Sequence, residues 1–353
     1  MIHSSLAKGS SKRQTLIFIS LGVLLLLFVL MDLLTGTVKI PVSNFPAILT
    51  NSDNINPVWK TIFYDFRIPK TITAILAGCA LSVSGLQMQT IFRNPLAGPD
   101  VLGVSSGASL GVALVVMGFG DTIIADNMGF LGSWIQIIAA WIGAGIVLFL
   151  ILIVSLRVRD IMTILILGIL FGSAASALVS IMQYFSPQSL LKAFVIWSMG
   201  SLSNLTAVQL NVLSISLAVG FILTLISIRI MNVMLLGDNY SQSMGVNIRT
   251  ARVLVFLSTS LLSGSITAFC GPVAFIGIAV PHLSRLVFRT ANHFILIPAS
   301  ILIGSMVMLL ADVISQLPGS GLILPVNSVT AILGIPVVIW VIIYNRRFVS
   351  LNG

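Results

Sequence analysis

Acidic residues and cysteine are scarce in this chain of 353 residues. The sequence contains no glutamate, so all nine acidic residues are aspartates, and its two cysteines, Cys79 and Cys270, stand apart inside apolar runs. There is no CxxC pair and no Cys/His cluster with the spacing of metal ligands, so neither a disulfide framework nor a metal site is expected. The HExxH, GxSxG and paired-carboxylate patterns are missing as well, which argues against an enzyme of these types.

A phosphate-binding loop for nucleotides is also missing. Such a loop has the pattern GxxxxGK[ST], and none of the six lysines follows a glycine. The chain therefore cannot hold ATP in the usual way, and an ATP-driven activity would require hydrolysis by a partner. We expect the chain not to be an enzyme and to bind no cofactor, with ATP and Mg held by partner subunits.

Apolar residues are abundant: 57% of the chain is hydrophobic, 8% is charged and the mean hydropathy is +1.12. This composition is typical of a protein that lies in a bilayer. A membrane-crossing helix needs about 20 apolar residues, and the apolar runs predict about ten spans. We therefore expect an all-α polytopic membrane protein with a single transmembrane domain over residues 1–353. The predicted spans are 15–34, 69–91, 101–119, 133–155, 161–184, 207–230, 252–270, 274–289, 294–316 and 328–344.

The positive charges predict which way the chain crosses the membrane. The first apolar run is too long for a signal peptide and lacks a cleavage site, so it is expected to be an uncleaved helix with the N-terminus inside. Threading the spans from there puts thirteen cations on the cytoplasmic side: Lys8, Lys12, Arg13, Arg93, Arg157, Arg159, Arg229, Arg249, Arg252, Arg285, Arg289, Arg346 and Arg347. The outer side has five cations, Lys39, Lys60, Arg67, Lys70 and Lys192, and six aspartates, Asp32, Asp53, Asp65, Asp121, Asp126 and Asp312. This bias places both termini in the cytoplasm. It also explains the formal charge of +9 without a nucleic-acid partner.

Three connecting segments are long enough to carry structure of their own. On the outer side, residues 35–68 are expected to be irregular, and residues 186–204 have room for a short extra helix. On the inner side, residues 231–250 are polar, with room for two short helices. From composition alone, this inner loop is equally well explained as a solvated connection.

Small residues recur along the second and third predicted helices. In lipid they let helix backbones approach closely, so helix packing is favoured over contact with a substrate. Between these helices, Pro95 and Pro99 together with the polar Asn94 prevent a continuous helix. Such backbone is tolerated at membrane depth only beside protein or a water-filled cavity. The segment is therefore predicted to shape the inner end of a pathway.

Short motifs follow one another along most of the chain. They are Arg67-Ile-Pro-Lys70; Ser-Gly-Leu-Gln at 84–87; Arg-Asn-Pro-Leu-Ala-Gly-Pro at 93–99; Leu-Gly-Val-Ser-Ser-Gly at 102–107; Ile-Trp-Ser-Met-Gly-Ser-Leu at 196–202; Leu-Gly-Asp at 236–238 with Met244-Gly245; Gly-Pro-Val-Ala-Phe-Ile-Gly at 271–277; Val-Pro-His-Leu-Ser-Arg at 280–285; Leu-Ala-Asp at 310–312; and Leu324-Pro325 with Thr-Ala-Ile-Leu-Gly-Ile-Pro at 330–336. Together they resemble the permeases of iron-siderophore, vitamin B12 and haem importers, the FecCD-type transmembrane subunits of type II ABC importers.

The resemblance implies an architecture and a set of partners. A permease of this family lies in the bacterial cytoplasmic membrane and pairs with a second permease, in a homodimer or a related heterodimer, around a central pathway. Two cytoplasmic ABC ATPase subunits bind below, an extracytoplasmic substrate-binding protein docks outside, and lipid surrounds the helices. The implied cargo is an iron-siderophore or a related large metal chelate. Haem and cobalamin are alternatives, because the binding protein selects the ligand.

The resemblance also implies docking and coupling residues. From the residues alone, Arg67 and Lys70 would be read as anchors at the membrane surface; in the family, the matching pair receives acidic residues of the binding protein. The family often has an arginine shortly after its Leu-Ala-Asp motif, where this chain has Gln316. ATPase coupling is implied for Gly237, Asp238, Ser241 and Gly245.

Gate and structural roles complete the set. The gate and pathway residues expected from the motifs are Asn94, Pro95, Pro99, Gly103, Ser105, Ser106, Gly107, Trp197, Gly200 and Ser201. An interfacial aromatic belt explains Trp197 equally well. Structural roles are expected for Pro281, His282, Arg285, Asp312, Pro325, Gly334 and Pro336. His282 is read as a hydrogen-bonding partner rather than a metal ligand or proton relay, and Asp312 as functional or paired, with no partner evident.

An ion-coupled secondary transporter is the alternative from another class. Such a protein should carry several buried acids or broken helices near the membrane midplane to bind the coupling ion. Only Asp312 comes close to this pattern.

Overall fold

The structure, a computed structural model, describes residues 2–38, 40–50, 56–119, 130–158, 160–203, 205–316 and 323–349. Lys39, Asp53, Asp121, Asp126, Arg159 and Asn204 lie outside the described residues, as do the side chains of Lys8, Arg346 and Arg347. The helices are α1 (Ile2–Leu34), α2 (Phe45–Leu49), α3 (Pro57–Thr61), α4 (Ile68–Ile91), α5 (Val104–Ala113), α7 (Phe130–Arg157), α8 (Ile161–Phe185), α9 (Gln188–Ser198), α10 (Ala207–Met234), α11 (Asp238–Ser243), α12 (Ile248–Cys270), α13 (Ile276–Phe288), α14 (His293–Ser315) and α15 (Val326–Val349). No strand occurs among these residues.

Each of the ten ranges predicted as membrane spans contains a helix, and the all-α fold class is confirmed. Seven helical segments of the described chain are long and apolar enough to cross a membrane. Three apolar helices are shorter: Val104–Gly118, Ile276–Phe288 and Val326–Val341. The short helix expected within residues 186–204 is α9.

Two connecting segments differ from the prediction. Residues 57–68 were expected to be irregular, but α3, a π-helical stretch at Ile62–Arg67 and α4 follow one another directly. The Asn56 side chain starts this segment by accepting a hydrogen bond from the backbone N–H of Val58 at 3.0 Å. On the other side, the loop with room for two helices contains one, α11, because α10 runs on to Met234 and α12 begins at Ile248.

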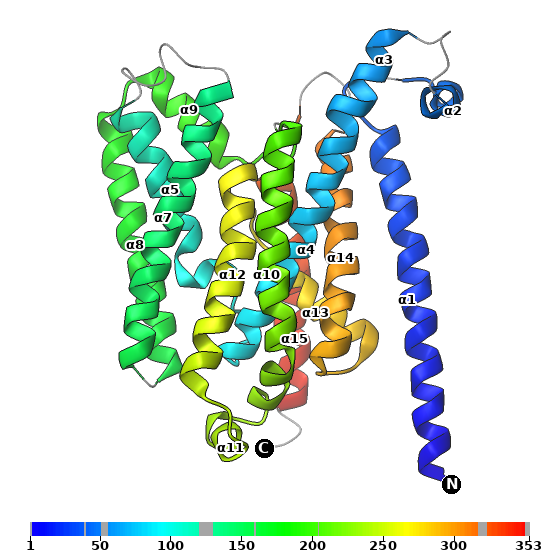
Figure 1. Cartoon of the computed structure of the whole chain (residues 1–353), viewed down its shortest axis with the longest axis vertical. Helices are drawn as coiled ribbons and strands as arrows, with labels where there is room; N and C mark the ends of the chain where they lie inside the picture. Colours follow the sequence, from blue (N-terminus) through cyan, green and yellow to red (C-terminus); the bar gives the residue numbers. More distant parts are fainter. Residues whose placement is uncertain are drawn as a thin grey trace.

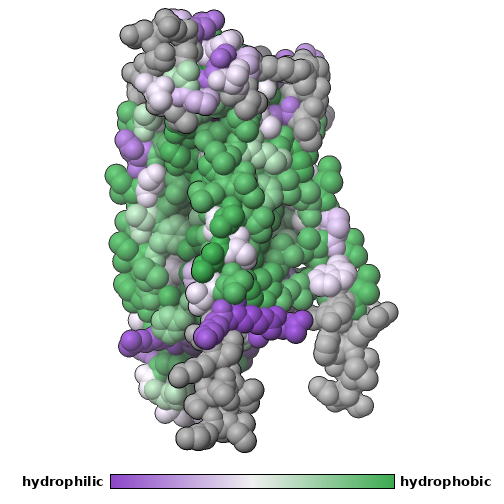
Figure 2. All heavy atoms as spheres, turned by 90° about the vertical axis from the view of Figure 1, so that its right-hand side faces the viewer, coloured by the Kyte–Doolittle hydropathy of each residue, from purple (hydrophilic) through white to green (hydrophobic). Residues whose placement is uncertain are grey.

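The long helices stand side by side with α4, α10 and α12 near the centre (Figure 1). The first helix lies at one edge, and α5, α7 and α8 form a group at the opposite edge. One end of the bundle carries α9 and the other carries α11, and we call them the α9 end and the α11 end. The residues between the two ends form a broad hydrophobic band on the face that Figure 2 shows.

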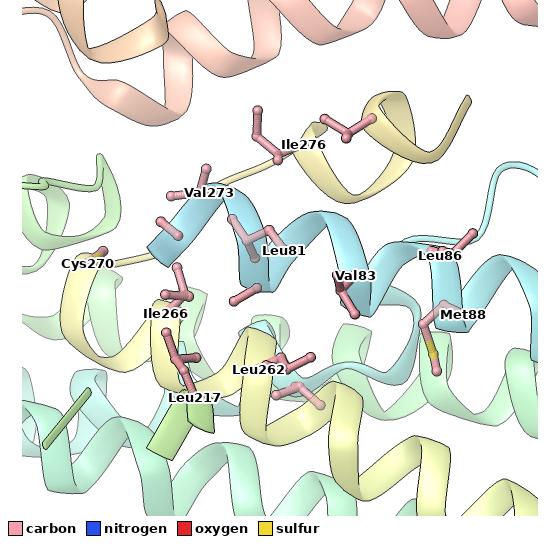
Figure 3. Close-up of a cluster of buried hydrophobic side chains, with 14 of the residues drawn as sticks. Leu81, Val83, Leu86, Met88, Leu217, Leu262, Ile266, Cys270, Val273 and Ile276 are labelled. Atoms are coloured by element: carbon pink, nitrogen blue, oxygen red, sulfur yellow. The ribbon is translucent and has the colours of Figure 1, made fainter. Parts of the chain in front are cut away.

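Glycines in the core let the helix backbones touch. A Cβ at Gly85 of α4 would overlap the carbonyl of Gly277 in α13, and one at Gly107 of α5 would lie 2.5 Å from the carbonyl oxygen of Gly143 in α7. The packing role expected for the small residues is thus visible at these contacts. Leu81, Leu86 and their neighbours on α4 pack with α12 in the buried cluster of Figure 3.

Candidate functional site

The segment after α4 breaks the helix and turns the chain back. Arg93 has φ 46° and Gly103 has φ 71°, so both adopt the left-handed region, which suits glycine better than arginine. The Asn94 side chain accepts a hydrogen bond from the Leu96 N–H at 2.9 Å. The Pro95 carbonyl accepts one from His282 Nε2 at 2.7 Å. His282 thus ties this segment to α13, and it is buried there.

A polar groove of about 460 Å³ opens between α5, α8 and α9. Its polar lining consists of Asp100, Ser105, Ser106, Ser109, Ser176, Ser180, Gln183, Ser198 and Asn327. We call it the serine groove. The lining includes Ser105 and Ser106, two of the predicted pathway residues, while the adjacent Gly107 is buried against α7.

Helical spacing explains why the serines face one way. Ser176, Ser180 and Gln183 recur on α8 at intervals of four and three residues, which places them on one face of the helix. Ser176 and Ser180 are exposed, whereas Val179 is buried. An exposed polar stripe on a helix this apolar is stable at membrane depth when it faces protein or a water-filled cavity. These α8 residues were not singled out from the sequence, although their spacing could have revealed them.

The segment after α9 is fixed at the α9 end. Gly200 has φ 75° and donates its N–H to the Trp197 carbonyl at 3.1 Å. The Ser201 N–H then donates to the Cys270 carbonyl at 2.8 Å. Through these bonds the segment is held against the end of α12. Trp197 is partly buried and its ring lies 5.9 Å from that of Phe194.

At the α11 end, two glycines bound the short helix α11, Gly237 with φ 106° and Gly245 with φ 84°. The hydroxyl of the buried Ser241 donates to the carbonyls of Gly237 at 2.7 Å and Val233 at 3.0 Å, which holds α11 against the end of α10. Positive φ at both ends makes glycine the residue best suited to these positions.

The Asp238 carboxylate joins three parts of the chain. Its Oδ1 pairs with Arg93 of the segment after α4, and its Oδ2 accepts from Arg252 of α12 at 2.9 Å. Arg93 and Asp238 are partly exposed, with 43% and 30% of their side chains accessible, and Arg252 is 4% accessible. A displacement of α11 would therefore be transmitted through the Asp238–Arg93 ion pair to the segment that leads to the serine groove.

Arg67 and Lys70 are buried near the α9 end, with exposed fractions of 4% and 6%. Arg67 donates from Nη1 to the Leu33 carbonyl and from Nη2 to the Val38 carbonyl, both at 2.6 Å. Lys70 Nζ lies 2.6 Å from Asp312 Oδ2 and 3.5 Å from Asp32 Oδ1.

The structure thus supplies the partner of Asp312 that the sequence left open, and we call Asp32, Lys70 and Asp312 the buried ion cluster. Gln316 also donates to Asp312 Oδ2, at 2.7 Å. Docking of a binding protein on Arg67 and Lys70 stays a prediction, and both cations already have partners within the chain. They line a cavity of about 260 Å³ beside Gln316 and Ser203.

The remaining predicted residues lie inside helices or contact them. Arg285 donates to Gln89 Oε1 at 2.5 Å and lines a cavity at the α11 end with His282. Pro281 and Pro336 lie inside α13 and α15, and Gly334 packs against Phe275. The Pro325 carbonyl accepts the Val329 N–H at 3.1 Å at the start of α15. Among the described residues, no group of three His, Cys, Asp or Glu side chains could hold a metal ion.

Comparison with known proteins identifies the family. The model of the FecCD transport family matches residues 24–344. The hemin transport system permease protein HmuU of Yersinia pestis is 34% identical over 328 residues, which cover 93% of this chain and 96% of that protein. The vitamin B12 import system permease protein BtuC of Escherichia coli O9:H4 is 31% identical over 344 residues, covering 97% of this chain and 99% of that protein.

The fold matches as well. A solved structure described as an inward-facing conformation of a putative metal-chelate type ABC transporter superposes with a TM-score of 0.79 and 29% identity, covering 93% of this chain and 99% of that one. The match extends over nearly the whole length of both chains. The chain is therefore a member of the FecCD transport family and has the fold of a type II ABC importer permease.

Proposed function

We propose that the chain is the transmembrane permease of an ATP-driven importer, which moves an iron-siderophore or a related large metal chelate from a binding protein into the cytoplasm. Haem and cobalamin, named for the relatives above, are the alternative cargoes. The serine groove is the observation that carries the proposal. It offers hydroxyl and amide groups along apolar helices, as a route for a polar solute requires.

The groove is open along one side, where α8 presents exposed apolar residues beside its serines. Ile166, Ile169 and Leu170 are about half exposed on this helix. A second permease packed here would cover apolar surface and close the groove into a central pathway. The second subunit would be either another copy of this chain or a related permease.

The α11 end is proposed to face the cytoplasm, and the bacterial cytoplasmic membrane is the proposed location. Arg93, Arg157, Arg229, Arg249 and Arg289 stand at this end of their helices, which agrees with the positive-inside rule. In this orientation, α11 lies where ATPase subunits would bind.

Coupling would run through Asp238. An ATPase that moves α11 would pull on Arg93 through its ion pair with Asp238, and Arg93 begins the segment that ends at Asp100 and Ser105. Gly237 and Gly245 would let α11 tilt without breaking α10 or α12. Hydrolysis at the partner would thereby open and close the inner side of the pathway.

The binding protein is proposed to dock at the α9 end. The cavity beside Arg67 and Lys70 is the place where an acidic residue could approach these cations. Reversing both charges to glutamate is a poor test of docking, because it would also leave Asp32 and Asp312 without their cation. Lys192, which is exposed on α9, offers a milder charge change at the same end.

Uptake into proteoliposomes tests the proposed function. The permease would be reconstituted with its ATPase and its chelate-loaded binding protein, and uptake of a ferric siderophore, hemin and cobalamin would be measured with ATP and with a non-hydrolysable analogue. We expect uptake of one of these ligands that requires hydrolysis and survives ionophores. Uptake that persists without the ATPase and collapses with an ion gradient would instead establish a secondary transporter.

A further inference from the structure

The lining of the serine groove has a definite charge. Among the described residues that line it, Asp100 is the one ionisable side chain, and none is Lys, Arg or His. Asp100 is exposed, and the Ser105 hydroxyl donates a hydrogen bond to its Oδ1. Desolvation raises the pKa of Asp100 above its ordinary value, and this hydrogen bond lowers it in part, while the carboxylate stays exposed to water in the groove. The electrostatic potential inside the groove is negative when this exposed carboxylate is ionised.

The hydroxyl groups reinforce this polarity, because several of their hydrogens are already used. Ser109 donates to the Ser105 carbonyl at 2.9 Å, Ser180 to the Ser176 carbonyl at 3.0 Å and Ser198 to the Val195 carbonyl at 2.8 Å. A serine oxygen whose hydrogen is bonded elsewhere can still accept hydrogen bonds. These three serines therefore present acceptors to whatever occupies the groove, while the amide groups of Gln183 and Asn327 also offer N–H donors.

A solute in such a groove is favoured when it brings donors or positive charge. A negatively charged solute would meet the Asp100 carboxylate in a partly desolvated space, where like charges repel more strongly than in bulk water. A cationic or neutral solute with amide or hydroxyl hydrogens would replace water with the groove's free lone pairs. Anionic chelates and neutral or cationic chelates do not differ systematically in size, so the groove would distinguish them by their charge.

We propose that Asp100 makes the serine groove a charge filter, so that the chelates carried are neutral or cationic, while polyanionic chelates are disfavoured. The identity of the cargo as a chelate rests on the proposed function. The charge selectivity of the groove is a property of this chain and can be measured without a cargo. Asp100 is thus a specificity-determining residue placed where the segment after α4 meets α5.

Thiol modification measures this selectivity without any chelate or ATP. A reporter cysteine is placed at Ser176, whose hydroxyl lies 3.5 Å from that of Ser106 across the groove. Assembled transporter in membrane vesicles is treated with the cationic trimethylammonioethyl or the anionic sulfonatoethyl methanethiosulfonate. The cation-to-anion rate ratio is divided by the same ratio for a free thiol. The native Cys79 and Cys270 are buried, and the parent chain without the reporter measures their background.

We expect a normalised ratio above one that falls by roughly fivefold in Asp100→Asn, the order expected when a unit charge is removed within about 10 Å in a half-solvated groove. Asp100→Glu should keep most of the preference, because it keeps the charge. Asp65→Asn is the matched control, since it removes an exposed acid of the π-helical stretch that does not line the groove. A ratio that Asp100→Asn leaves unchanged, or a preference for the anion, would overturn the filter.

Transport provides the second measurement. Uptake of a neutral ferric tris-hydroxamate is compared with that of a trianionic ferric tris-catecholate, each presented by a binding protein saturated with it, and the ratio of the two uptake rates is compared between the unmodified chain and Asp100→Asn. We expect the neutral complex to be taken up faster, and Asp100→Asn to narrow the difference by a similar factor. Equal uptake of both complexes by the unmodified chain would contradict the filter and leave the importer intact. Uptake of neither, together with no uptake of hemin or cobalamin, would count against the proposed function, while the thiol ratios would still decide the filter.

Discussion

The two ends of the molecule use ion pairs in opposite ways. At the α9 end, Lys70 lies between Asp32 and Asp312, and all three side chains are almost fully buried. At the α11 end, Asp238 lies between Arg93 and Arg252, and the side chains of Arg93 and Asp238 are 43% and 30% exposed. Both are three-residue arrangements of alternating charge near the ends of membrane helices.

Burial determines what each arrangement can do. A buried pair is costly to break, because removing one partner leaves an uncompensated charge inside the protein. The buried ion cluster therefore joins α1, α4 and α14 permanently. A partly exposed pair exchanges its partners for water at little cost, so the Arg93–Asp238 pair can rearrange when α11 moves, while the buried Arg252 holds Asp238 to α12. We expect mutations at the α9 end to change stability and mutations at the α11 end to change coupling.

The largest effect is expected at Lys70. Lys70→Met would leave Asp32 and Asp312 buried without their cation, and we expect it to lower the free energy of unfolding by about 3–5 kcal/mol. The midpoint of thermal unfolding in detergent, together with membrane expression, measures the loss. Lys192→Met on the exposed face of α9 is the matched control. An unfolding midpoint equal to that of the unmodified chain would show that the cluster carries no stability.

A second variant tests whether the uncompensated charge is the cause. Adding Asp312→Asn to Lys70→Met removes one of the two carboxylates that Lys70 neutralises. We expect the double variant to be more stable than Lys70→Met alone, a non-additivity that marks direct coupling. Simple addition of two losses would mean that packing, rather than charge, explains the effect.

The next effect is expected at Asp238, and it should spare the fold. Asp238→Asn removes the charge of the bridge but keeps an oxygen that can accept from the buried Arg252, so we expect a stability loss of about 1–2 kcal/mol, smaller than that of Lys70→Met. Uptake per ATP hydrolysed should fall by roughly tenfold, the order expected from losing one charge-assisted interaction of about 1.5 kcal/mol. Parallel measurement of ATP hydrolysis and chelate uptake gives the ratio. An unchanged ratio would remove the bridge from the coupling route.

A smaller effect is expected at Gly245, where a substitution would strain the backbone without creating a steric clash. No atom lies within 4 Å of a Cβ added there, but φ is +84°. Gly245→Ala should therefore cost about 1–2 kcal/mol through strain at positive φ, and local hydrogen exchange in α11 should rise. Gly145→Ala in α7 is the control, because its Cβ also meets nothing and its φ is ordinary. Equal stability and equal hydrogen exchange in the two variants would mean that the backbone at residue 245 can change its φ angle without cost.

The smallest effect is expected at Gln316, where many relatives are expected to have an arginine nearby. Gln316 donates to Asp312 and lines the cavity at the α9 end. Gln316→Arg would add positive charge beside two carboxylates that share one lysine, so we expect stability to stay within about 0.5 kcal/mol of the unmodified chain or to rise. A clear fall in the unfolding midpoint would show that the cluster has no room for a second cation.

Much of the fold could be predicted from hydropathy, because a membrane-crossing helix can be recognised from the length and composition of its apolar run. The prediction of helix boundaries was wrong where a helix contains charged residues. Lys60, Asp65 and Arg67 made residues 57–68 look like an outer loop, although the helix continues through them. Arg67 is accommodated because backbone carbonyls of residues 33 and 38 accept its hydrogen bonds, and no local pattern reveals such distant partners.

The site was predictable in part. Motifs marked the segment after α4, α9 and the loop around α11, and they named Ser105, Ser106 and Asp238. They did not reveal that Lys70 pairs with Asp312, which is far away in the chain, or that Arg93 and Arg252 share Asp238. The serines of α8 were readable as a stripe, but without the neighbouring helices nothing told whether that stripe faced a groove or another helix.

Side-specific labelling of the serine groove tests the central claim most directly. In oriented vesicles of the assembled transporter, Ser176→Cys is exposed to a membrane-impermeant thiol reagent from one side or the other, with and without a non-hydrolysable ATP analogue. An importer pathway predicts that the cysteine reacts from the cytoplasmic side in one nucleotide state and from the outer side in the other. Reaction that is equal in both states, or absent from both sides, would contradict the groove as the pathway.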